Sequence, residues 1–287
     1  VQSMTAPIHR IGLALLVLTL ASACATSPTG RKQLMLVSEQ TAISASKQQY
    51  LQTMGKLQSE GKLVTDPKVL KRVDTITGRL ISQAILMRPD TKSWEWSVQV
   101  IDDPKMVNAW CMAGGRMAIY TGLIQKVDPT DDELAQVMGH EISHALANHT
   151  AERMSVAMVS QVGALGVGIA TDSAAVMAGA QGAAALAITL PNSRSSETEA
   201  DRIGIELAAK AGYDPRAAAT LWQKMGKAGG SGPPQFLSTH PAPGNRQATL
   251  TALAPQMMTY YEAPGARPMY KLARSPAPTS GSKSALK

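Results

Sequence analysis

One helix-forming segment constrains this 287-residue chain more than any other feature. Thr130 and Glu133 fit a capping box that starts a helix, and the acidic residues of TDDE suit the positive end of the helix dipole. The apolar residues that follow recur at helical spacing: Leu134, Val137, Met138, Ile142 and Ala145. The pattern predicts a helix that includes the sequence HEISH, residues 140–144.

The HEISH motif places two histidines one helical turn apart. His140 and His144 therefore share a face, and their imidazoles can converge on one metal ion. Glu141 is rotated by about 100° from His140, within reach of a zinc-bound water whose proton it would accept as the water attacks a carbonyl. The motif is short, and a solvated or core-packed pair of histidines is an alternative for HExxH alone.

A catalytic zinc needs a third protein ligand and an open position. The segment SRSSETEAD, residues 193–201, predicts a second helix start on which Glu197 and Asp201 share a face and Glu199 points elsewhere. Glu197 can supply the third ligand, and Asp201 can hold a ligating histidine through its second ring nitrogen. The alternative is an exposed acidic helix face paired with Arg202.

The first residues indicate export. Two basic or titratable residues, His9 and Arg10, precede an apolar run at residues 11–20, and small residues follow. This is the pattern of a secretory signal, and the run is shorter than the roughly 20 residues of a transmembrane helix.

Small residues directly before Cys24 resemble a bacterial lipobox. The resemblance predicts a signal peptide at residues 1–23, lipidation of Cys24 and a tether at residues 24–31. By similarity to lipoprotein sorting, Thr26 in place of Asp directs the protein to the periplasmic face of the outer membrane. Plain secretion after Ala23 is the alternative.

The rest of the chain predicts one domain, residues 32–260. Helices are expected from Ser38 to about Ser59 and from Asp66-Pro67 onward, and strands at residues 94–100 and 116–121. The Ala- and Gly-rich residues 154–190 predict a buried helical hairpin, with a membrane-inserted segment or a lid as alternatives. Residues 261–287 are rich in Pro, Gly and Ser and predict a disordered tail.

Composition excludes some classes of function. The formal charge is +7, yet Lys and Arg are scattered without basic runs or interleaved aromatics, so we expect no nucleic-acid partner. Aromatic residues make up 4% of the chain, with a single Phe, which favours closely packed helices. The second cysteine, Cys111, is expected to be a buried apolar residue.

HEISH followed by SRSSETEAD resembles the zinc metallopeptidases of the HtpX and CAAX-prenyl-protease type, in the gluzincin manner. Other segments agree with this family in order: LMLVSEQ at 34–40, NAW at 108–110, TGL at 121–123, AGYDP at 211–215 and STHP at 238–241. The resemblance covers about residues 30–255 and implies a mostly helical α+β fold of zincin type, with a small mixed sheet edging the active-site cleft. The signal and Cys24 suggest the periplasmic, outer-membrane lipoprotein branch.

The resemblance also implies roles for single residues. One Zn²⁺ per chain would be held by His140, His144 and Glu197, with Glu141 as the base and Asp201 behind the ligands. Asn108 resembles the residue that binds a substrate backbone on an edge strand.

Two further histidines complete this set. His240 resembles a histidine close to the metal, which would either stabilise the oxyanion or plug the open zinc position. His149 matches no ligand position, and we expect it at the surface near the end of the helix.

The sequence thus predicts an endopeptidase that cuts misfolded or unassembled envelope proteins, with the outer-membrane assembly machinery as a further partner. The alternative is a non-proteolytic chaperone or assembly factor that binds clients in the same cleft. A structural zinc site is a third possibility, favoured only if a fourth protein ligand holds the metal.

Overall fold

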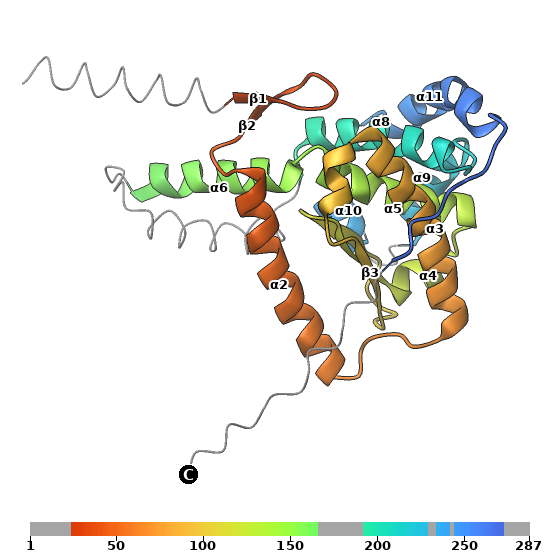
Figure 1. Ribbon diagram of the computed structural model, residues 1–287, viewed down its shortest axis with the longest axis horizontal. Coiled ribbons are helices and arrows are strands. Elements are labelled where there is room, and N and C mark those ends of the chain that lie inside the picture. Colours follow the sequence, from red (N-terminus) through yellow and green to blue (C-terminus); the bar gives the residue numbers. More distant parts are fainter. Residues whose placement is uncertain (1–23, 166–191, 229–233, 242–243, 273–287) are drawn as a thin grey trace, which may run out of the picture.

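The computed structural model describes residues 24–165, 192–228, 234–241 and 244–272 (Figure 1). These residues form mostly helices with two small sheets, which confirms the α+β prediction. The predicted signal peptide, residues 1–23, lies outside the described residues. So does most of the predicted helical hairpin at 154–190, of which only the part up to residue 165 is described.

A three-stranded mixed sheet lies beside the central helices. It consists of β3 (Ser97–Ile101), β4 (Ala109–Met112) and β5 (Arg116–Tyr120) in the order β3-β5-β4. β5 runs parallel to β3 and antiparallel to β4. Both predicted strands are confirmed, although the first begins at Ser97, because residues 94–96 link the end of a 3₁₀ helix, η1 (Pro89–Ser93), to the strand.

Two long helices pack around this sheet. Ser38 accepts a hydrogen bond from Thr41 N at the start of α2 (Glu39–Ser59), and Asp66 accepts one from Lys68 N at the start of α3 (Pro67–Met87). Both predicted N-caps are confirmed. The main core is built by apolar side chains of α3, the sheet and the central helix, including Leu80, Met117, Ile119, Leu134 and Met138.

The central helix is α5 (Asp131–Leu146), which carries HEISH. Its predicted capping box is confirmed: Glu133 N donates to Thr130 Oγ1 at 3.2 Å, and Thr130 N donates to Glu133 Oε2 at 2.8 Å. Every residue from Glu133 to Leu146 is buried. Polar side chains on this helix must therefore find partners inside the protein.

A second buried helix, α8 (Arg194–Lys210), crosses α5 closely. The crossing lies at Gly139 and Gly204, where a Cβ on Gly204 would stand 2.9 Å from His140 N. Only glycine allows the two backbones this approach. Because the crossing is next to His140, it sets the distance between the histidines of α5 and the acidic residues of α8.

The described chain begins as a β-hairpin. β1 (Cys24–Thr26) pairs antiparallel with β2 (Lys32–Leu34), and the hairpin contacts α6 (His149–Leu165). In Figure 1, α6 extends from the body of the protein beside the N-terminal end of α2. The predicted tether, residues 24–31, is thus part of a folded hairpin. Residues 24–26 pair with β2, and residues 27–31 form the turn between the strands.

The remaining helices complete the described part of the domain. They are α4 (Thr121–Val127), α9 (Ala217–Lys227), α10 (Gln235–Thr239) and α11 (Arg246–Tyr261). Beyond α11, Tyr270 N donates to Gly78 O of α3 at 2.9 Å, and Arg267 donates to carbonyls including Tyr261 O at 2.8 Å. The described start of the predicted disordered tail is therefore packed against the domain, and residues 273–287 lie outside the described part.

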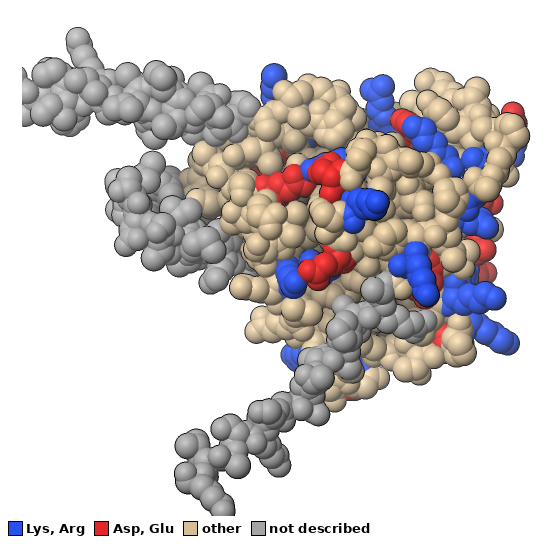
Figure 2. All heavy atoms as spheres, viewed as in Figure 1, with Lys and Arg blue, Asp and Glu red and all other residues tan. Residues whose placement is uncertain are grey.

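The surface carries charges of both signs. On the face shown in Figure 2, basic side chains lie in separate groups, many with acidic neighbours. Among the helices that the structure describes, none has both the length and the apolar content needed to cross a membrane.

The close crossing of α5 and α8 yields a first prediction. Gly204→Ala should lower the free energy of unfolding by about 1–3 kcal/mol, because the added methyl collides with the backbone at His140. Chemical denaturation measures the change. Gly226→Ala is the matched control, since its Cβ meets nothing within 4 Å on helix α9 and alanine favours a helix. Equal stability of the two variants would contradict the prediction.

Candidate metal centre

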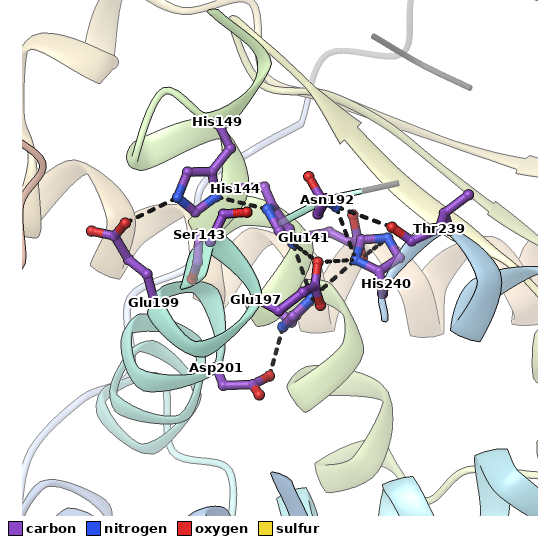
Figure 3. Close-up of polar contacts among 12 residues, drawn as sticks. Glu141, Ser143, His144, His149, Asn192, Glu197, Glu199, Asp201, Thr239 and His240 are labelled. Carbon is purple, nitrogen blue, oxygen red and sulfur yellow. Dashed lines mark hydrogen bonds and ion pairs between the residues drawn. The ribbon is translucent and has the colours of Figure 1, made fainter. Parts of the chain in front are cut away.

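Four buried side chains from three elements converge at one point (Figure 3). His140 and His144 come from α5, Glu197 from the first turn of α8, and His240 from the end of α10. One ligand atom from each lies within 4.8 Å of all the others. The alternatives of a solvated histidine pair and of an exposed acidic face on α8 are wrong, because His140 and His144 are 3% exposed and Glu197 is fully buried.

The distances within this cluster fit a tetrahedral zinc ion. His140 Nε2 lies 3.0 Å from His144 Nε2 and 3.2 Å from His240 Nδ1. The oxygens of Glu197 lie 3.3 Å from the Nε2 atoms of His140 and His144, and 3.0 Å from His240 Nδ1. Zinc ligands at about 2.0–2.1 Å in a tetrahedron stand roughly 3.3 Å apart. The donor set of imidazole nitrogens and a carboxylate oxygen is also one that zinc prefers.

The electrostatics of the cluster favour a cation. Burial by itself lowers the pKa of His140, but the charge of Glu197 and the hydrogen bond to Asp201 outweigh it and raise that pKa to about 9. Burial would raise the pKa of the Glu197 carboxyl, yet the neighbouring His140 and His144 hold it well below its usual range. An ionised carboxylate buried among imidazole nitrogens attracts a positive ion to the space between them.

Asp201 supports His140 from behind. Its Oδ1 lies 2.9 Å from His140 Nδ1, as the sequence predicts for a residue that orients a ligating imidazole. Arg246 at the start of α11 donates from Nη2 to the same oxygen at 2.5 Å, and its guanidinium lies 3.4 Å from the centre of the Trp222 ring. Sequence reasoning missed Arg246. The available signal was its position in the first turn of a helix. A positive charge is unfavourable there because of the helix dipole, which indicates an acidic partner elsewhere in the fold.

Glu141 lies at the edge of the cluster rather than within it. It is 2% exposed, and burial raises the pKa of its carboxyl despite the opposing charges of His240 and His140. Its Oε1 stands 3.4 Å from His240 Nε2 and makes no hydrogen bond to any residue the structure describes. A buried carboxylate oxygen without a hydrogen-bond partner is suited to accept a proton from an incoming molecule.

A cleft of about 220 Å³ opens beside Glu141. The outer strand β4 forms one wall, and no described strand pairs with its free edge. Asn108, directly before β4, lines this cleft as predicted, and its Oδ1 accepts a hydrogen bond from Ala109 N. Arg153 of α6 and His240 also face the cleft.

His149 differs from its prediction. It is 1% exposed, not at the surface, and its Nδ1 lies 2.8 Å from Nδ1 of His144. Asn148, which adopts a left-handed conformation at φ 56°, turns the chain between α5 and α6 so that His149 faces back toward the cluster. No spacing rule in the sequence predicts this position of His149.

An HExxH helix crossed by a glutamate-bearing helix, beside a small mixed sheet, is the arrangement of the zincin class of metallopeptidases. The sequence matches the model of Peptidase family M48 over residues 67–254. The chain belongs to peptidase family M48, a family of zinc metallopeptidases.

Several named proteins are similar in sequence to this chain. The mitochondrial metalloendopeptidase OMA1 of Arabidopsis thaliana is 39% identical over 60% of this chain and 35% of its own length. The Bos taurus metalloendopeptidase OMA1 is 33% identical over 84% of this chain and 48% of its own. The beta-barrel assembly-enhancing protease of Escherichia coli K12 is 32% identical over 70% of this chain and 42% of its own. The chain thus spans less than half the length of each relative.

The buried contact between Arg246 and Asp201 yields a second prediction. Arg246→Met should lower the free energy of unfolding by about 3–5 kcal/mol, because it removes the cation that pairs with the buried carboxylates of both Asp201 and Glu197. Urea denaturation of the purified protein checks this value. Arg216→Met is the control and should change little, since the Arg216 side chain is 68% exposed in its pair with Asp214. A small loss at Arg246 would show that the pair is not a structural requirement.

Proposed function

We propose that this protein is a zinc-dependent endopeptidase whose metal ligands are His140, His144 and Glu197. The observation that carries the proposal is the convergence of these buried groups beside Glu141, at the edge of a cleft. Bound zinc would polarise the scissile carbonyl and acidify the attacking water.

Glu141 is the proposed general base. Its carboxylate accepts the proton of the attacking water through the oxygen that makes no hydrogen bond within the described residues, and then delivers it to the leaving amine nitrogen. The raised pKa of Glu141 suits both steps, because a carboxyl with a higher pKa is a stronger base and can hold the proton until the amine leaves.

The free edge of β4 is the proposed docking site for a substrate in extended conformation. Backbone hydrogen bonds to an edge strand tolerate many side chains, which suits clients without one consensus sequence. Asn108 at the start of β4 would hold the substrate backbone beside Glu141.

His240 is the proposed plug of the fourth metal position. Its Nδ1 lies 3.2 Å from His140 Nε2, and its ring stacks on Phe236 with centroids 4.4 Å apart. A histidine ligand at that position excludes substrate, so α10 must move before cleavage. The same contact supports the alternative of a structural site, in which four protein ligands hold the metal permanently.

The proposed location is the periplasmic face of a bacterial outer membrane, with a lipid anchor at Cys24. The signal-like N-terminus supports this location, and the name of the Escherichia coli relative refers to β-barrel assembly. The proposed substrates are misfolded or unassembled envelope proteins. The OMA1 relatives are named as mitochondrial, which indicates that related domains also act in another compartment.

The role of Glu141 yields a third prediction. Glu141→Gln should retain zinc and lose roughly 10²–10⁴-fold in the rate of casein hydrolysis, the usual contribution of a positioned base. Metal analysis and a proteolysis assay measure the two quantities. Glu206→Gln, the same change at a partly exposed position of α8, should leave both unchanged.

Complementation distinguishes the chaperone alternative from proteolysis. If Glu141→Gln restores a deletion strain as well as the wild type does, client binding is the function and proteolysis is not required.

The position of His240 yields a fourth prediction. His240→Ala should raise the rate of casein hydrolysis while zinc content stays at one ion per chain, because the plug is removed. A lower rate with zinc retained would favour oxyanion stabilisation, and loss of the zinc would favour a structural four-ligand site.

A further inference from the structure

The second ring nitrogen of His144 has a specific partner. His144 Nε2 faces Glu197 in the cluster, and Nδ1 on the other side of the ring lies 2.8 Å from Nδ1 of His149. An imidazole that offers the Nε2 lone pair to a metal carries its proton on Nδ1. His144 Nδ1 therefore donates, and His149 Nδ1 accepts.

This direction determines the tautomer of His149. With Nδ1 as an acceptor, His149 carries its proton on Nε2, which lies 3.1 Å from Glu199 Oε2 (Figure 3). The opposite tautomer would set two N–H groups against each other and a lone pair against a carboxylate. One arrangement of protons thus satisfies every contact from His144 through His149 to Glu199.

Glu199 is in turn held by the N-terminal hairpin. Thr29 Oγ1 donates to Glu199 Oε1 at 2.5 Å, and Arg31 Nε donates to Oε2 at 2.7 Å. The two terminal nitrogens of Arg31 donate to Glu152 of α6, both at 2.6 Å. Glu199 and His149 are 5% and 1% exposed, so water competes little for these bonds.

The arrangement parallels that behind His140. There the second ring nitrogen meets Asp201 directly, and Arg246 holds the carboxylate. Behind His144, the ring of His149 lies between the histidine and its carboxylate, Glu199, and Arg31 donates to that carboxylate. Both carboxylates lie on α8, and each arginine comes from a segment near one end of the described chain.

We propose that His149 and Glu199 are positioning residues for His144, and that Arg31 ties them to the hairpin formed by β1 and β2. The inference rests on the proposed role of His144 as a metal ligand. Hydrogen bonds behind a ligating histidine fix its ring and raise its basicity, and their loss typically weakens metal binding by 10- to 100-fold. Docking of the hairpin therefore contributes to the affinity of the metal centre.

Zinc affinity tests the proposal without reference to proteolysis. Competition with a chromophoric chelator should show about tenfold or greater weakening in Glu199→Gln, which preserves the size of the side chain. His149→Phe keeps a ring in the same space and should weaken binding similarly. Arg31→Met should shift affinity in the same direction by less. Circular dichroism of each variant verifies the native fold.

Glu152→Gln is the matched control. It neutralises the other carboxylate partner of Arg31 and leaves the hydrogen bond between His149 and Glu199 in place. Its zinc affinity should fall by clearly less than that of Glu199→Gln. If it weakens binding as much as Glu199→Gln does, loosening of the hairpin alone explains the effect and the positioning role is overturned.

The tautomers provide a second measurement. Long-range ¹H–¹⁵N spectra of the zinc-loaded protein should show His144 protonated on Nδ1 and His149 on Nε2. The reverse tautomer at His149, or unchanged zinc affinity in a folded Glu199→Gln variant, would overturn the inference. A wild type that binds no zinc would overturn the proposed function together with it, whereas zinc binding without proteolysis would overturn the proposed function alone.

Discussion

The mutual approach of buried imidazole nitrogens and a carboxylate is the interaction on which the rest of the site depends. Nitrogens that face one another at about 3 Å cannot all carry a proton on the facing side. The Glu197 carboxylate beside them is fully buried, so solvent does not stabilise its charge. A cation between these groups satisfies all of them at once. The close crossing of α5 and α8 at Gly139 and Gly204 is what brings the two ligand-bearing helices to this distance.

The cost of burying so many polar groups is offset by pairing them in a definite order. Each of the two α5 histidines directs one nitrogen toward the cluster and the other toward a carboxylate of α8, directly for His140 and through His149 for His144. Arginines from distant segments then balance those carboxylates. Since an unpaired buried charge is strongly destabilising, the folding of the outer segments and the order of the site are coupled.

The match to the family model covers only part of this network. The match to peptidase family M48 spans residues 67–254, which include α3, α5, α8 and Arg246. The hairpin that carries Arg31 precedes the matched region. The residues of the candidate metal centre lie within the matched region, whereas the hairpin contacts their surroundings from outside it, next to Cys24, the predicted site of membrane attachment.

The elements whose signals are local can be predicted from the sequence alone. The capping box of α5, the caps of α2 and α3, and the one-turn spacing of His140 and His144 follow from near neighbours in the chain, so the pattern suffices to predict them. Which distant side chains complete the site depends on the tertiary structure. Arg246, His149, Glu199 and Arg31 take their roles from the packing of α11, α6, α8 and the hairpin, and contacts across 45 to 168 residues leave no periodic signal in a single sequence.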